Sequence, residues 1–359
     1  MTVAHDGHHP VRTGQLKWLL DPYQDWAEAE GLPIYGGLAV DLPELETAPW
    51  PRFDVDGALV HIDARGDFLS MYVMDIRPGG STSPTRHLYE AVIYVLDGQG
   101  STTIETPSGE SRSFEWQRGS LIAIPLNSKH RHFNGSGQNR ARLIAVTNLP
   151  MVMKLYRTED FIFNTDFSFE DRWETHSFDG GGTFIENREH RHLWETSFVP
   201  DLLAFQHLQQ SPSRGTGSTN IVFTLAEGVL HGHCSEIPPY SFKKAHRHGD
   251  GFHIIQLSGK GYSLYWYEGD EPERVDWQYG TLHTPPNEMF HQHFNTSTSP
   301  GRYVAIGFGS SKYPFTAEKM QATQHDYRVK HPKQIEYEDQ DPKIDEMFQL
   351  EVGADKAQN

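Results

Sequence analysis

Residues 243–261 read KKAHRHGDGFHIIQLSGKG, and this stretch decides the fold because it returns in altered form at residues 84–100, PTRHLYEAVIYVLDGQG. The agreement continues downstream at a constant offset of 161 positions. It pairs His87, Gly98, Gly100, Trp116, Gly119, Pro125, His130, His132, Phe133 and Asn134 with His248, Gly259, Gly261, Trp277, Gly280, Pro286, His291, His293, Phe294 and Asn295. No gap is needed, so we infer two copies of one domain.

Each copy has the pattern of short β-strands. The expected strands are residues 70–78, 92–96, 120–125, 253–257 and 281–286, all rich in apolar or β-branched residues. Glycines separate them, as at the Gly-Gln-Gly and Gly-Lys-Gly turns. Many short strands with frequent turns predict an all-β fold of two tandem barrels or sandwiches.

Helices are expected only at the flanks. Residues 21–31 begin with an Asp N-cap and a proline and end with a glycine, and a second candidate starts at Pro342. The expected divisions are an N-terminal extension (1–56), a first barrel (57–150), an aromatic-rich linker (151–215), a second barrel (216–312) and a C-terminal tail (313–359).

The composition restricts the partners. The net charge is −17, with 31 basic against 48 acidic residues, which argues against nucleic-acid binding. No segment has the apolar length that spans a membrane. The single cysteine, Cys234, and the polar N-terminus favour the cytoplasm.

The histidines of the second copy have the spacing of a metal site. Side chains alternate along a strand, so His246 and His248 point to one side, and His291 on a neighbouring strand can complete a three-imidazole face. Such a face suits Fe(II), Mn(II), Zn(II), Cu(II) or Ni(II), and the sequence does not choose among them.

Other residues near this pattern receive further expectations. His293 shares a face with His291 and is a candidate acid–base or supporting group, and Gln256 shares the face of His246 and His248. His253 lies at the opposite strand phase, which directs it away from the site. Lys243 could attract an anionic substrate, or could lie at a solvated strand end.

These residues resemble the two motifs of the cupin superfamily. The second copy offers His246-Arg-His248, Gly259, Gly280, Pro286, His291 and Asn295. The first offers Thr85-Arg-His87, Gly98, Gly119, Pro125, His130 and Asn134. The resemblance covers about 70–147 and 230–310 and implies a bicupin, in which each of two small β-barrels encloses a possible metal site.

The chain departs from the cupin pattern in two ways. The glutamate of the first motif is replaced by Ala91 and Phe252. Oxalate-metabolising bicupins use that carboxylate, whereas gentisate and salicylate ring-cleaving dioxygenases are similar to this chain in lacking it. In the first copy Thr85 replaces the first ligand, which leaves only His87 and His130. A barrel kept for packing and assembly is therefore the prediction there, with a second metal site as the alternative.

The resemblance implies an enzyme, and the leading hypothesis is a non-haem dioxygenase. It would use Fe(II) and O2 to cleave a C–C bond of a small aromatic or dicarbonyl-like substrate that chelates the metal. One alternative is an O2-independent isomerase or lyase acting on a sugar or hydroxy acid, with the same ligands. Another is a non-enzymatic small-molecule-binding bicupin. A homo-oligomer is expected in each case.

Overall fold

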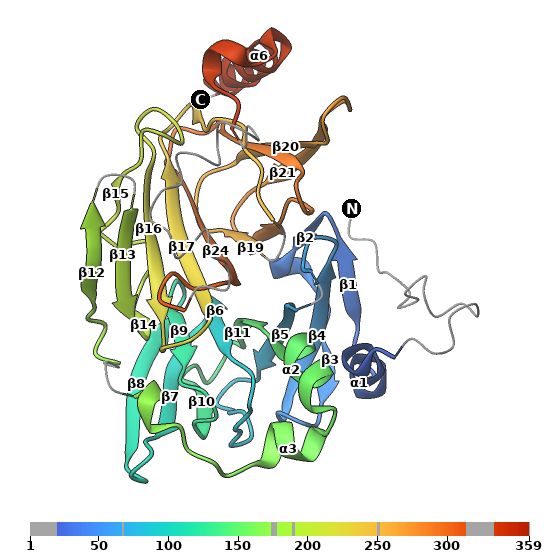
Figure 1. Cartoon of the computed structure of the whole chain (residues 1–359), viewed down its shortest axis with the longest axis vertical. Helices are drawn as coiled ribbons and strands as arrows, with labels where there is room; N and C mark the ends of the chain where they lie inside the picture. The colour runs from blue at the N-terminus through green and yellow to red at the C-terminus, as the bar shows by residue number, and fades with distance from the viewer. Residues whose placement is uncertain are drawn as a thin grey trace.

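Two barrels lie end to end, and each is built from one large and one small sheet, mostly antiparallel (Figure 1). The computed structural model describes residues 20–66, 68–173, 178–188, 191–249, 252–313 and 334–358. The first barrel has an eight-stranded sheet and a three-stranded sheet, and the second has a nine-stranded sheet and a four-stranded sheet. The predicted all-β fold of two tandem barrels is confirmed.

The first half contains the following elements. They are α1 (Pro22–Glu30), β1 (Ile34–Gly37), β2 (Ala39–Asp41), β3 (Ala48–Trp50), β4 (Val55–Ile62), β5 (Ser70–Ile76), β6 (Ala91–Asp97), β7 (Gln99–Glu105), β8 (Ser111–Gln117), β9 (Leu121–Ile124), β10 (His130–Asn134), β11 (Ala141–Thr147), α2 (Leu149–Tyr156) and α3 (Glu159–Asn164).

The second half continues with a longer series of strands. They are β12 (Thr183–Arg188), β13 (Arg191–Thr196), β14 (Phe198–Val199), β15 (Gln209–Gln210), β16 (Thr219–Leu225), β17 (Leu230–Ile237), β18 (Ser241–Phe242), β19 (Phe252–Gln256), β20 (Gly261–Trp266), β21 (Glu273–Trp277), β22 (Thr281–His283), β23 (Phe290–Asn295) and β24 (Gly301–Phe308), followed by α6 (Pro342–Gln358).

The two barrels exchange one strand each. β2, from the N-terminal extension, pairs with β22 at the edge of the second barrel's large sheet. β14, from the linker, pairs with β9 of the first barrel. The segments that the sequence assigns to an extension and a linker therefore help to build the two large sheets. The boundaries of the predicted domains stay a prediction.

An equivalent arginine anchors each exchanged segment. Arg142 donates to the carbonyls of Leu42, Pro43 and Leu45, just after β2. Arg302 donates to the carbonyls of Leu202, Leu203 and Phe205, just after β14. Each arginine also pairs with a carboxylate at the same place in its barrel, Asp75 at 2.7 Å and Glu236 at 2.7 Å. These matching contacts relate the two halves as copies.

The repeated glycines and asparagines have the same structural reason in both halves. A Cβ at Gly100 would lie 2.0 Å from the Phe133 carbonyl oxygen, and one at Gly261 would lie 1.9 Å from that of Phe294, so no larger residue fits. Asn134 Nδ2 donates to three carbonyls around its turn, and Asn295 does the same in its own. The repeat therefore records constraints of the barrel fold.

The hydrophobic core has separate parts with different roles. The interior of the first barrel is filled by apolar side chains from both of its sheets, together with side chains of α1, α2 and α3. A second core lies between the two large sheets and joins the barrels. The apolar cluster inside the second barrel is small: Ile237, Ile254, Tyr303 and Ala305, with Phe252 at its edge. The second interior therefore has fewer apolar side chains than the first, and buried polar side chains such as Gln256, His283 and His293 take their place.

The helices cover opposite ends of the molecule. α1 begins at the predicted cap, where Asp21 accepts from the Gln24 N–H, and ends at Gly31. α6 packs Ile344, Phe348 and Val352 on the small sheet of the second barrel, at the top of Figure 1. α2 and α3 are not predicted from the sequence. The residues that form them lie at the start of the segment described above only as an aromatic-rich linker. No helix in the described ranges is long and apolar enough to span a membrane.

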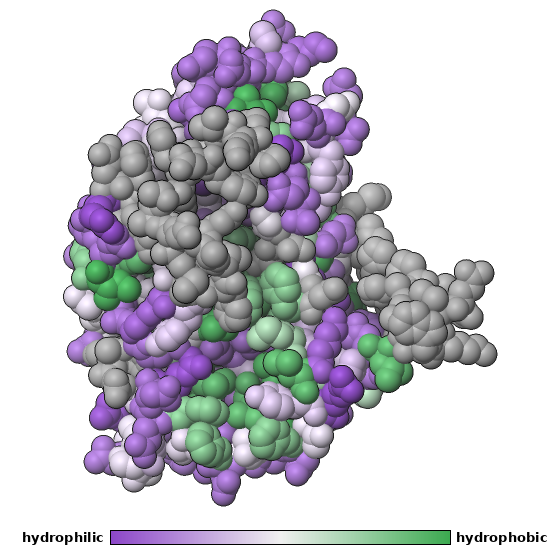
Figure 2. All heavy atoms as spheres, in the orientation of Figure 1, coloured by the Kyte–Doolittle hydropathy of each residue, from purple (hydrophilic) through white to green (hydrophobic). Residues whose placement is uncertain are grey.

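An exposed apolar region accompanies α2 and α3. It consists of Leu155, Tyr156, Phe161 and Phe167. Apolar side chains gather in Figure 2 over the area where Figure 1 places these helices. The expected homo-oligomer stays a prediction.

Candidate metal centre

The three predicted ligand histidines come together in the second barrel. His246 and His248 lie on the connection between β18 and β19, and His291 lies on β23. A backbone bridge between His246 and His291, with N–H to O distances of 3.0 and 2.8 Å, fixes the connection against the strand. One ring nitrogen from each histidine lies within 4.8 Å of the others, and this is the only such group of three found in the described part of the chain.

The orientation of each ring is set by a backbone carbonyl. The Nδ1 atoms of His246, His248 and His291 lie 3.2, 2.7 and 3.2 Å from the carbonyl oxygens of Lys244, Gly249 and Met289. A ring that donates from Nδ1 keeps a lone pair on Nε2. Two of these Nε2 atoms, on His246 and His291, face each other at 3.1 Å. A cation bound between these two nitrogens would offset the repulsion of their lone pairs.

This spacing fits a metal ion. Nitrogens that bind one metal at about 2.1 Å and subtend a right angle are about 3 Å apart. The carbonyl contacts correspond to the second hydrogen bond that metal-binding histidines usually make. The donor set is three neutral imidazoles, which suits several divalent transition metals.

Burial keeps two of the ligand rings, those of His246 and His291, neutral. Desolvation, reinforced by the charge of neighbouring histidines, lowers the pKa of His246 and of His291 well below its ordinary value. A neutral imidazole is the form that binds metal, because its lone pair is free. The site is therefore ready to accept a cation at neutral pH. Phe252 packs its ring edge-on against His248 at 5.3 Å and gives this side of the site an apolar surface.

The two predicted catalytic residues lie deeper in the same barrel. The His293 ring lies 5.5 Å from that of His291, and its Nδ1 lies 2.7 Å from Ser263 Oγ. Gln256 is fully buried, and its Nε2 lies 3.2 Å from His283 Nε2. Neither of these two contacts involves an Nε2 atom of the three ligand histidines.

Sequence reasoning missed several polar groups in this interior. His283 Nδ1 lies 2.5 Å from the Tyr265 hydroxyl, and both side chains are fully buried. Burial lowers the pKa of His283 to about 3 and raises that of Tyr265. Tyr303, also missed, contacts Lys243, a residue that the sequence did single out: Lys243 Nζ lies 2.9 Å from the Tyr303 hydroxyl.

These residues could have been found from the sequence by comparing equivalent positions of the two copies, which are apolar in the first and polar in the second. Strand register pairs Val95 with Leu143 in the first barrel and Gln256 with Tyr303 in the second. It also places Ile104 opposite His130, where Tyr265 lies opposite His291. Ile122 and His283 are a further equivalent pair, opposite Ile93 and Ile254. At the same fold positions one barrel is apolar and the other polar.

The first barrel has only part of this arrangement. His87 and His130 are buried with ring centroids 5.3 Å apart, and their Nδ1 atoms face the carbonyls of Tyr89 and Ser128. Thr85 makes the backbone bridge to His130 that His246 makes to His291. Glu90 does not replace the missing ligand, because its carboxylate accepts from the N–H groups of Val229 and Leu230.

His253 points away from the metal centre, as its strand phase predicts. It shares the face of Ile255, which packs in the core between the barrels. That face is covered by the first barrel, so His253 is fully buried. Burial, with a contribution from Arg65, lowers its pKa to about 3.

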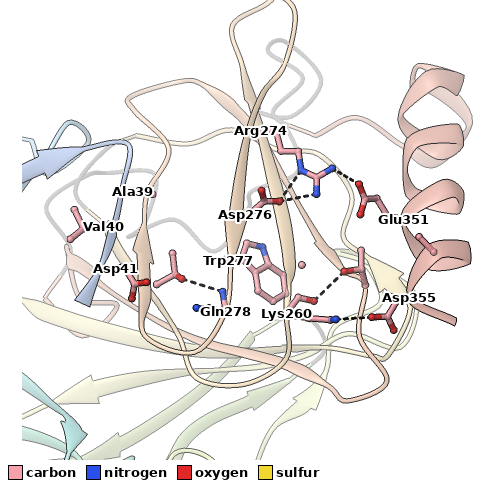
Figure 3. A pocket seen from close by; sticks show the side chains of 14 residues that line it. Ala39, Val40, Asp41, Lys260, Arg274, Asp276, Trp277, Gln278, Glu351 and Asp355 are labelled. Carbon is pink, nitrogen blue, oxygen red and sulfur yellow. Dashed lines mark hydrogen bonds and ion pairs between the residues drawn. The ribbon is translucent and has the colours of Figure 1, made fainter. Parts of the chain in front are cut away.

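A polar groove of about 490 Å³ lies elsewhere, between the second barrel and α6. Figure 3 shows Arg274 pointing toward Asp276 and Glu351, and Lys260 toward Asp355. Two of these ion pairs join the barrel to α6. None of the predicted site residues lines this groove, which we interpret as part of the helix attachment.

Comparison with known proteins agrees with the fold. Residues 72–147 match the family model described as the Cupin domain. The second half repeats the strand order and anchoring contacts of this region, so the chain has the fold of two tandem cupin-like barrels, as the repeat predicts. No curated protein matches the chain.

Solved structures of oxalate decarboxylase mutants from Bacillus subtilis are similar in shape. A serine-to-alanine mutant of that enzyme is 13% identical over 76% of this chain and 77% of its own, with a TM-score of 0.48. A deletion mutant of the same enzyme is 13% identical over 83% of this chain and 87% of its own, with a TM-score of 0.49.

Proposed function

We propose that the second barrel is the active site of a metal-dependent dioxygenase that cleaves a C–C bond of a small aromatic or dicarbonyl-like substrate. The observation that carries the proposal is the cluster of three inward-facing imidazole nitrogens within 4.8 Å of one another. The choice of a dioxygenase rests on the resemblance to gentisate and salicylate dioxygenases, which also lack the motif's glutamate. The substrate and O2 are the expected partners.

His246, His248 and His291 are the proposed ligands, and Fe(II) is the proposed metal, with Mn(II), Zn(II), Ni(II) and Cu(II) as alternatives. A metal bound by these three residues would supply open coordination positions for a chelating substrate and O2 and, in the case of Fe(II), electron transfer between them. The backbone carbonyls behind the rings hold the three lone pairs on one side. This preorganisation leaves little rearrangement for binding.

The rest of the interior orients the substrate. Phe252 and Ile254 form an apolar wall, which suits a flat organic molecule. His293 is fixed through Nδ1 by Ser263, so its Nε2 is the atom proposed to exchange a proton with the substrate's hydroxyl. Gln256 acts one step further back, by holding His283 against Tyr265.

The test combines metal analysis with oxygen uptake. Protein purified without added metal is expected to contain an equimolar divalent metal. After loading with Fe(II) it should consume O2 with at least one member of a panel of hydroxylated aromatic acids, catechols and β-diketones. Turnover of a panel member without O2 would instead favour the isomerase or lyase. A loaded protein with no turnover in either atmosphere would leave the binding protein as the better account.

A further inference from the structure

The interior of the second barrel contains a buried charge with no counter-charge among the described residues. Six charged side chains are buried in the described ranges, namely Asp75, Glu90, Arg142, Glu227, Lys243 and Asp355. The four carboxylates pair with Arg142, Arg172, Lys312 and Lys260. Lys243 is the one buried charged side chain among them for which the described residues supply no ion pair.

The described surroundings of Lys243 are polar but contain no acid. Lys243 is 4% exposed. Its Nζ donates to the Tyr303 hydroxyl at 2.9 Å and lies 4.8 Å from the centre of the Tyr303 ring. One neutral acceptor and a ring face compensate only part of the cost of removing an ammonium from water. The first barrel has Thr82 at this position, so the fold itself does not require a lysine there.

This charge lies close to the candidate metal centre. The Lys243 N–H donates to the His293 carbonyl at 3.0 Å, and the His246 N–H donates to the His291 carbonyl on the same strand. The Tyr303 ring packs against His293 at 5.5 Å and against His233 at 5.9 Å.

We propose that Lys243 and the Tyr303 hydroxyl form a binding site for an anionic oxygen group of the substrate, behind His293. This site rests on the proposed function, because the anionic group would be one end of the substrate and the other end would reach the metal centre. The anionic group is a carboxylate or an ionised hydroxyl, because both place negative oxygen against an ammonium and a hydroxyl donor. Its binding supplies the counter-charge that the described interior lacks.

The test uses metal-free protein, so that it does not depend on metal chemistry. Affinities for benzoate, for 4-nitrophenolate and for neutral benzamide are measured by calorimetry. The wild type is expected to bind at least one of the two anions about tenfold more tightly than benzamide, the usual effect of a charged hydrogen bond. Tighter binding of benzoate would identify the group as a carboxylate, and tighter binding of 4-nitrophenolate would identify it as an ionised hydroxyl.

Substitutions then locate the site. Lys243→Met should remove the preference for the anion and raise the melting temperature of the empty protein, because an unpaired buried charge is gone. Lys243→Arg should restore part of the preference, and Tyr303→Phe should weaken anion binding more mildly. The matched control is Lys244→Met, because Lys244 already pairs with Glu336. It should leave the preference unchanged.

Three results would overturn the proposal. One is a wild type that binds neither anion more tightly than benzamide. Another is a folded Lys243→Met variant that keeps the preference. The third is a Lys243→Met variant that melts below the Lys244→Met control, since the lysine would then be structural. None of these measurements involves metal or O2, so failure of the dioxygenase proposal is seen separately.

Discussion

The two barrels have one fold but different interiors. The first contains a continuous apolar core, with Val95, Ile104 and Ile122 at positions facing the inside. The second has Gln256, Tyr265 and His283 at those positions, all fully buried. Because the first barrel folds with apolar residues there, the polar groups of the second are not needed for folding. The difference supports the proposal that the second barrel holds the functional site and that the first serves as a scaffold.

The largest expected effect follows removal of one ligand. His291→Ala should reduce metal affinity more than about 100-fold, since a missing ligand costs more than the roughly 10–100-fold typical of supporting residues. The matched control is His130→Ala, the same change at the equivalent position in the first barrel, which should leave metal content unchanged. Elemental analysis of the two folded variants measures the effect. Equal losses in both would show that the barrels share the metal chemistry.

The comparison can also be reversed by adding the missing ligand to the first barrel. Thr85 occupies the place of His246 in the bridge to its partner strand. Thr85→His should create a second group of three imidazoles with His87 and His130. The metal content per chain should then double, as seen by elemental analysis. An unchanged content in a folded variant would mean that more than the third histidine separates the two barrels.

Exchanging the interiors should change stability in opposite directions. The triple substitution Gln256→Val, Tyr265→Phe and His283→Ile removes both ends of the two hydrogen bonds that join these side chains. Stability should therefore stay equal or rise by about 1–3 kcal/mol. Ile122→His places an imidazole in an apolar core and should cost about 2–4 kcal/mol. Urea unfolding measures both. A destabilised triple variant would contradict the claim that these groups are functional.

Acid should destabilise both halves by a similar and smaller amount. His61 in the first half and His283 in the second have a pKa of about 3 because burial disfavours their charged form. Below about pH 6.5 the unfolded chain binds protons that the folded chain does not, so stability falls by roughly 1.4 kcal/mol per pH unit for each such histidine. This loss of folding stability occurs below the pKa of histidine in the unfolded chain, about 6.5, and is absent above it.

Unfolding of metal-free protein at several pH values between neutral and mildly acidic tests this slope. The triple variant, which lacks His283, should show a slope shallower by the contribution of one histidine. An identical slope in wild type and variant would show that His283 is protonated in the folded barrel.

Much of the fold could be predicted from the sequence because the repeat records shared backbone constraints. Gly100 and Gly261 recur because a Cβ would collide with the neighbouring strand. The three ligand candidates could be found because alternation and the repeat place them together. The strand exchange could not, since β2 and β14 span only three and two residues and carry no local pattern.

The interior of the second barrel escapes sequence reasoning for a related reason. The repeat is found from positions at which the two copies are identical. The polar residues of the second interior lie at positions at which the copies differ, as at Ile122 and His283, so the repeat does not point to them. A lone charge such as Lys243 normally faces water, which is why a solvated strand end is one of its two interpretations from sequence. Only the packing of Tyr303 against it shows that it is buried.

The central claim is that the second barrel, and not the first, holds the metal. Anomalous diffraction from crystals of protein grown in the presence of Fe(II) or Mn(II) tests it most directly. The account predicts one strong peak between the Nε2 atoms of His246, His248 and His291, and none between His87 and His130. A peak confined to the first barrel, or no peak among the three histidines, would contradict it.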